Sequence, residues 1–297
     1  MKAVILRIAL IATWLCLVGW LIRHEAYPEY FSGTADGYKS LIPRNLLLRE
    51  SWMAIKMNDV QVGYTRNVWN ISDKDNCRYY ANENQMYLWL EVNPAGITVS
   101  TDSTFLLDAH YNLYEFTFTV RVEDMPVTLK GARSNAGYFD VSMITTGIVR
   151  KFKISIPSDS VLFTPSGGTL TRNLKPGQSI TLNSLDPFTM KKSKIVMTAL
   201  RKENIEYDGI SYNATLIATK ASGLLFHSWL DQSGDIVRQT SPFGLLMERS
   251  TMEKAMAWTR IRNQKQAQST QREGLSTTIN ETSIQALIET FLKGIEQ

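Results

Sequence analysis

A regular alternation of apolar and polar residues, repeated through most of the chain, is the feature that most restricts its fold. In residues 113–122, for example, Phe116, Phe118 and Val120 alternate with polar or charged residues. Successive side chains of a β-strand point to opposite faces, so this pattern gives a strand with one apolar and one polar face. Such strands are typical of a half-buried antiparallel sheet.

Many short runs of this kind follow one another, separated by turn-forming residues. Asn58-Asp59, between two such runs, predicts a tight hairpin. Strands at this spacing argue against a parallel α/β arrangement. We expect a mainly β fold, a curved antiparallel sheet that forms a half-barrel or two packed sheets, with few short helices, one of them a cap at 251–258. The sequence leaves open whether 50–158 and 178–256 share one sheet.

The N-terminal stretch from Leu6 to Ile22 carries no charge after Arg7. A helix needs roughly 20 apolar residues to cross a bilayer, and Arg7 can extend its charge toward the headgroups. We therefore predict an uncleaved single-pass membrane anchor that contacts lipid through Ile8, Leu10, Trp14, Leu17, Trp20 and Ile22. A cleaved signal peptide and a buried core helix are the alternatives, although the exit from the apolar stretch is a poor cleavage site.

These patterns divide the chain into five segments. We predict a transmembrane signal-anchor at 1–23, a stalk at 24–49, a β-rich extracytoplasmic domain at 50–258, a polar linker at 259–280 and a C-terminal amphipathic helix at 281–297. The few residues before the anchor cannot form a domain. The body is therefore expected on one side of the inner (plasma) membrane, the extracytoplasmic side.

Composition excludes several classes of protein. The net charge is +4 and the basic residues are scattered, so no surface for nucleic acid is indicated. Cys77 is the only cysteine outside the apolar N-terminal stretch, so no disulfide can form within the body. We expect a fold that is held together by an apolar core.

Catalytic chemistry has little support in the residue pattern. His110 and His227 are the histidines of the body, and neither lies in a recognisable nucleophile motif. Metal-ligand spacing and a phosphate-binding glycine loop are absent from the sequence. We predict no cofactor, no metal and no enzymatic activity, and we keep a cryptic hydrolase as a remote alternative.

A ligand-binding face is the more plausible site. A sheet with one apolar face and few helices must curl, pair with a second sheet or leave an apolar groove. Aromatic and methionine side chains suited to an apolar ligand recur in the first half of the body, and we predict as ligand-binding residues Trp52, Trp69, Met86, Trp89, Phe116 and Phe118. The alternative is that these residues are simply core.

Four short segments carry a family resemblance: 50–64 (ESWMAIKMNDVQVGY), Asp186-Pro187, 229–234 and 241–255. They resemble the bacterial extracytoplasmic β-rich domains that precede transglutaminase-like domains, which are distantly similar to the LolA-like lipoprotein-carrier half-barrels. In those two-part proteins a catalytic Cys-His-Asp domain follows, and a polar tail and one helix stand there in this sequence. The resemblance implies a scaffold or binding domain and carries over no catalytic residue.

Together these observations predict a membrane-anchored envelope protein. Its exported β domain is expected to bind an apolar ligand, either a lipid or an acyl chain, or a protein partner within a membrane complex. The first alternative is a purely structural or interaction module without a ligand cavity, and the second is the cryptic hydrolase.

Overall fold

The computed structural model describes residues 2–21, 33–35, 37–42, 48–74, 77–92, 95–134, 137–162, 174–185, 191–242 and 244–260. Its helices are α1 (Lys2–Leu21), α3 (Gly37–Leu41) and a further helix at 252–260. The strands of its first half are β1 (Gly33–Thr34), β2 (Arg49–Met57), β3 (Val60–Lys74), β4 (Cys77–Val92), β5 (Ala95–Leu107), β6 (Leu113–Val122), β7 (Met125–Arg133), β8 (Phe139–Thr145) and β9 (Ile148–Ile154). Those of its second half are β10 (Ser160–Leu162), β11 (Ser179–Leu185), β12 (Lys192–Tyr207), β13 (Ile210–Ala221), β14 (Leu224–Leu230), β15 (Ile236–Thr240) and β16 (Leu245–Ser250).

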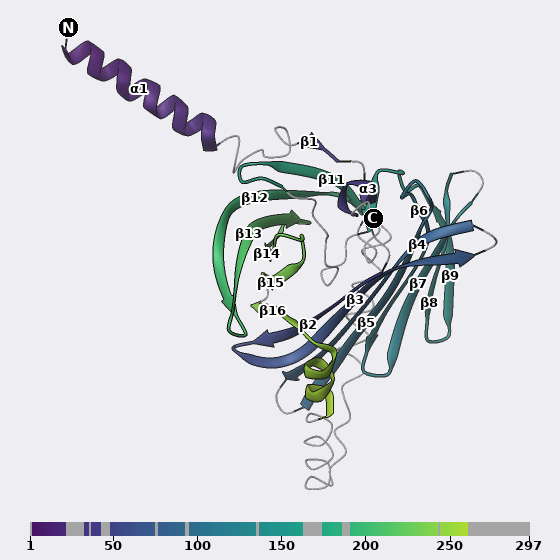
Figure 1. Ribbon diagram of the computed structural model, residues 1–297. Helices are drawn as coiled ribbons and strands as arrows, with labels where there is room; N and C mark the ends of the chain where they lie inside the picture. Colours follow the sequence, from purple (N-terminus) through teal and green to yellow (C-terminus); the bar gives the residue numbers. More distant parts are fainter. Residues whose placement is uncertain are drawn as a thin grey trace.

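The sixteen strands form one strongly curved sheet (Figure 1). Strands β2 to β9 make one antiparallel meander, and strands β11 to β16 make another. Antiparallel pairing of β16 with β2 joins the two meanders, with Met247 opposite Ile55. The short strands β1 and β10 both pair with β11 in parallel. The prediction of a mainly β, curved sheet with few helices is therefore confirmed, and the two halves share a single sheet.

Local turn chemistry sets the hairpins of both meanders. Asn58 and Asp59 connect β2 to β3 and have φ angles of 49° and 62°. Positive φ at both central residues gives a two-residue turn whose twist matches that of the strands, which confirms the predicted hairpin. Asp208 and Gly209 connect β12 to β13 in the same way, with φ angles of 52° and 73°.

The main apolar core lies on one face of the sheet, which is called the concave face below. It includes Phe116 from β6, Leu182 from β11 and Ile217 from β13, each at most 1% exposed. In the order of the sheet these strands lie far apart. Their side chains can share one cluster only because the sheet curves round and brings both meanders together.

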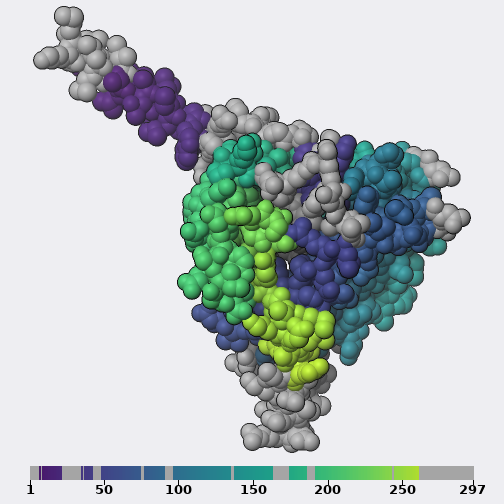
Figure 2. All heavy atoms as spheres, in the orientation of Figure 1, coloured from purple at the N-terminus to yellow at the C-terminus, as the bar shows by residue number. Residues whose placement is uncertain are grey.

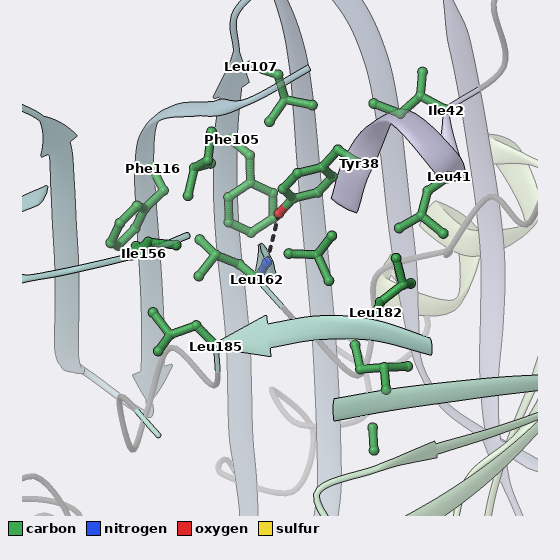
Figure 3. Packing of buried hydrophobic residues seen from close by; sticks show 14 of the residues in the cluster. Tyr38, Leu41, Ile42, Phe105, Leu107, Phe116, Ile156, Leu162, Leu182 and Leu185 are labelled. Carbon is green, nitrogen blue, oxygen red and sulfur yellow. Dashed lines mark hydrogen bonds between the residues drawn. The ribbon is translucent and has the colours of Figure 1, made fainter. Parts of the chain in front are cut away.

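The segment 33–42 corrects the prediction of a stalk over 24–49. Tyr38, Leu41 and Ile42 are buried in the main core, and the Tyr38 hydroxyl accepts a hydrogen bond from the Leu162 N–H at 2.9 Å (Figure 3). Spacings of three and four residues place these three side chains on one side of a helical turn. Gly37 has a φ of 48°, and a Cβ there would lie 2.9 Å from the Asp159 backbone. Residues 33–42 are therefore part of the core.

The structure tests the predicted terminal segments only in part. The side chains described in α1 are mostly exposed and apolar, including Leu10, Trp14, Leu17 and Trp20. Across the described ranges, no helix combines the length and the apolar character that a membrane crossing requires. This finding does not support the membrane-spanning segment predicted at 1–23. Ile22 lies outside the described residues.

Only the start of the C-terminal region can be compared with its prediction. The helix at 252–260 confirms the predicted helical cap. Beyond it, the remainder of the polar linker and the amphipathic helix at 281–297 lie outside the described residues.

A buried ion network reinforces the junction between β16 and β2. Glu248 is 4% exposed and accepts hydrogen bonds from Lys56 Nζ on β2 at 2.7 Å and from Arg238 Nη2 on β15 at 2.7 Å. Burial raises the pKa of the Glu248 carboxyl, but the hydrogen bonds from both cations outweigh burial and hold that pKa below its usual value. The carboxylate therefore links three consecutive strands of the sheet.

Replacing Glu248 by Gln is expected to destabilise the protein by roughly 2–4 kcal/mol at pH 7, because two cations lose their buried anion. A carboxyl with a lowered pKa stabilises the fold above its usual pKa, and this contribution disappears as the pH falls through the lowered value. The difference from wild type should therefore shrink below about pH 4. Urea unfolding across this pH range measures it. Glu115→Gln, which breaks the more exposed pair with Lys74, should cost under about 1 kcal/mol. Equal losses in the two variants would contradict this assignment.

Tyr38→Phe removes the only hydroxyl that the described residues give to the buried Leu162 N–H. A buried donor without a partner costs about 1–3 kcal/mol, so the free energy of unfolding should fall by that amount. Tyr138→Phe is the matched control because Tyr138 is 50% exposed, and it should change stability by less than about 0.5 kcal/mol. A neutral Tyr38→Phe variant would show that segment 33–42 does not depend on this contact.

Candidate functional site

The concave face carries two apolar clusters. The larger is the main core described above, and the smaller consists of Met53, Ile55, Val62, Leu88 and Met247. The smaller cluster spans the junction of the two meanders, since Met53 and Ile55 come from β2 and Met247 from β16. Methionine side chains are flexible and adapt to irregular apolar partners. The concave face therefore offers a second apolar surface that both meanders build.

A buried polar band lies on the same face of β3, β4 and β5. The strand register aligns Asn67 with Asn84 and Asn84 with Ser103, and every second residue along a strand shares a face. The band comprises Thr65, Asn67, Asn82, Asn84, Thr101 and Ser103, all less than 9% exposed. In register it lies between Trp69 and Phe105 of the main core on one side and Leu88 of the smaller cluster on the other. Amide and hydroxyl groups thus separate the two clusters.

Hydrogen bonds satisfy part of this polar band. The Asn82 Nδ2 group donates to Asn67 Oδ1 at 3.3 Å and to the Val68 carbonyl at 3.2 Å. The Thr65 hydroxyl donates to the Gln85 carbonyl at 2.9 Å. None of the six side chains carries a charge. The band can therefore donate to and accept from a neutral polar group without the cost of burying a charge.

Trp69 lies at the border between the band and the main core, opposite Asn82 in the register. Its side chain is 6% exposed, and the buried Nε1–H has no acceptor among the described residues. Three other buried polar atoms are likewise without a partner in that part of the chain: Asn70 Oδ1, Ser184 Oγ and Thr259 Oγ1. Trp69 differs from these because its free donor adjoins a band of polar groups on the concave face.

The polar band reaches solvent at β2. Ser51 lies opposite Asn67 and shares its face, yet Ser51 is exposed. The pairing of β16 with β2 ends at Ser250 opposite Trp52, so β16 does not flank Ser51. Figure 2 shows β16 and the helix at 252–260 in yellow-green next to the violet residues of β2. The end of β2 is thus the place where the concave face opens toward the surface.

The structure divides the six predicted ligand-binding residues between the two faces. By register, Trp69, Met86, Phe116 and Phe118 lie on the concave face. Trp52 and Trp89 lie on the opposite, convex face, which corrects their predicted place beside the other four. A chain of ring contacts on that face links Trp52 to Tyr64, Tyr64 to Tyr87 and Tyr87 to Trp258 of the C-terminal helix.

Sequence reasoning missed the asparagines of the polar band. Asn67 is in phase with Trp69, and Asn82 and Asn84 are in phase with Met86 and Leu88. An amide at an apolar phase of a strand was the available signal. It was passed over because β3 and β4 carry polar residues on both faces, which hides the alternation.

The residues considered for catalysis lie apart from this site. His110 is exposed in the turn between β5 and β6, His227 is half-buried on β14, and Cys77 is exposed at the start of β4. In the described ranges, neither imidazole is hydrogen-bonded to Cys77, a serine or a carboxylate, and no group of three His, Cys, Asp or Glu side chains is placed to hold a metal ion. The geometry therefore does not assemble a nucleophile with a base.

Comparisons with known proteins gave two similar solved structures. No family model and no curated protein matches the chain. A β-barrel-like protein of the domain of unknown function DUF1849 from Brucella abortus is 9% identical with a TM-score of 0.47, over 69% of this chain and 97% of that one. A DUF1089-family protein from Pseudomonas aeruginosa is 14% identical with a TM-score of 0.34, over 63% of this chain and 92% of that one. The resemblance to LolA-like half-barrels and to transglutaminase-associated domains stays a prediction.

Proposed function

We propose that the β domain binds an amphipathic ligand, a lipid or another acyl compound, on its concave face. The observation that carries this proposal is the uncharged polar band buried between two apolar clusters. A ligand with an apolar chain and a polar group matches that sequence of surfaces. The site comprises the smaller apolar cluster, the polar band, and Trp69 and Met86.

The alternation of surfaces supports binding over a role as plain core. Burying amides and hydroxyls costs free energy unless they are hydrogen-bonded, and apolar side chains of similar size would avoid that cost. A polar band at the centre of a curved apolar face is therefore retained against its own cost to stability. Recognition of a polar group is a function that would explain it, as pockets for small molecules combine an apolar lining with a few polar groups.

A second candidate is a structural or interaction module without a ligand. The burial of Tyr38, Leu41 and Ile42 favours it, because segment 33–42 already occupies part of the concave face. That segment packs with the main core and is not among the residues of the smaller cluster. The two candidates therefore differ in whether an added acyl compound reaches the smaller cluster and the polar band.

We also propose that α1 attaches the protein to a membrane, with the body on the extracytoplasmic side. Leu10, Ile11, Trp14, Leu17 and Trp20 are each at least 57% exposed. Such a contiguous apolar surface is costly in water and marks a membrane or protein contact. A location beside lipid would also supply the acyl ligand, and a partner in a membrane complex is compatible with the same surface.

Photolabelling locates the ligand. The full chain, held in a detergent micelle, is irradiated with a monoacylglycerol that carries a diazirine in its acyl chain, and labelled peptides are mapped by mass spectrometry. Labels are expected on the concave residues Met53, Met86 and Met247. Labels confined to 9–21, or to the convex residues Trp52 and Trp89, would contradict binding on the concave face.

Attachment through α1 is tested with liposomes of neutral phospholipid. The full chain should float with the vesicles, because transfer of the exposed apolar side chains into lipid is favourable by about 25 cal/mol per Å². A variant with Leu10, Trp14 and Leu17 replaced by Ser should float several-fold less. Flotation that does not change in this variant would show that another surface makes the contact.

A further inference from the structure

We infer that Trp69 and the polar band form a subsite for a neutral carbonyl group, the ester or amide that links the acyl chain of the ligand to its headgroup. This inference rests on the proposed function and specifies the ligand class for the same site. It follows from three features of the site, namely a free donor, the absence of charge and the position of the opening.

The free donor is the indole N–H of Trp69. An indole nitrogen donates one hydrogen bond and accepts none, so this group requires an acceptor. It is buried within the concave core, and no described residue supplies that acceptor. A buried donor without a partner is costly, and a ligand carbonyl oxygen placed beside Trp69 and Asn82 would remove the cost.

The absence of charge selects a neutral group. The band consists of threonine, serine and asparagine side chains, so a phosphate or carboxylate placed there would lose its hydration without gaining a cation. Arg49 is the nearest cation in the register, opposite Trp69. Its guanidinium is ion-paired with Asp235 in the turn between β14 and β15. An ester or amide therefore fits this subsite better than an anion does.

The positions of the surfaces orient the ligand. Trp69 and Asn67 lie two residues apart on one strand, and Ser51, opposite Asn67, is exposed. A carbonyl at Trp69 thus leaves the headgroup near the opening at β2. The acyl chain can then extend past Met86 toward Leu88 in the smaller apolar cluster. A neutral acyl ester or acyl amide meets all three requirements.

Three photoactivatable probes with the same diazirine-bearing chain test this inference on the full chain: a monoacylglycerol, an alkane and a fatty acid. The concentration that half-saturates labelling of the concave peptides is measured for wild type and for Trp69→Phe. Phenylalanine keeps an aromatic side chain but removes the N–H. The monoacylglycerol should need about 3- to 10-fold more probe in the variant, the loss of one neutral hydrogen bond, and the alkane should not change.

Trp89→Phe on the convex face is the matched control and should leave all three probes unchanged. In the wild type, the monoacylglycerol should half-saturate at a lower concentration than the ionised fatty acid. If Trp69→Phe leaves the monoacylglycerol unchanged while the alkane still labels the concave face, the inference is overturned and the proposed function stands. If no probe labels the concave face, both are overturned.

A spectroscopic readout keeps the test valid if Trp69→Phe proves unstable. In the wild-type protein labelled with ¹⁵N-tryptophan, the indole N–H signal of Trp69 is assigned through a conservative Trp69→Tyr variant. Added monoacylglycerol should shift its proton downfield, as expected for a new hydrogen bond to a carbonyl. A signal that the monoacylglycerol and the alkane move equally would overturn the inference, because it would reflect filling of the site alone.

Discussion

The pairing of β16 with β2 is the constraint on which the rest of the structure depends. It places Met247 opposite Ile55 and turns two separate antiparallel meanders into one sheet. The smaller apolar cluster draws residues from both strands, so it exists only when they are paired. Glu248 reinforces the junction through Lys56 on one side and Arg238 on the other. The concave face, and with it the proposed site, is therefore a product of this contact between distant parts of the chain.

Much of the fold could be predicted because its information is local. Alternation identified the strands, and the residue types at 58–59 identified a hairpin that depends on positive φ angles. The junction of β16 with β2 could not be predicted in this way, since Lys56 and Glu248 lie 192 residues apart in the sequence. Segment 33–42 was missed for a similar reason. Its three apolar side chains occupy a single helical turn, too short for a periodic pattern to stand out.

The candidate site was predicted less completely than the fold. Alternation marks which residues share a face of a strand, but it does not say which face turns inward in a strand that is apolar on both sides. Trp69, Phe116 and Phe118 were therefore placed correctly, and Trp52 and Trp89 were not. The polar band escaped notice because asparagine in a strand usually indicates exposure or a turn. Its burial depends on the curvature of the sheet, which arises from tertiary packing.

Hydrogen exchange of the backbone amides, followed by mass spectrometry on the full chain, tests the central claim of a single sheet most directly. The account predicts that residues 49–57 and 245–250 exchange slowly and to a similar extent, as expected for neighbouring strands inside a sheet, and more slowly than the edge strand β9 at 148–154. Exchange of 245–250 as fast as that of β9 would show that β16 is itself an edge, and the shared concave face would not exist.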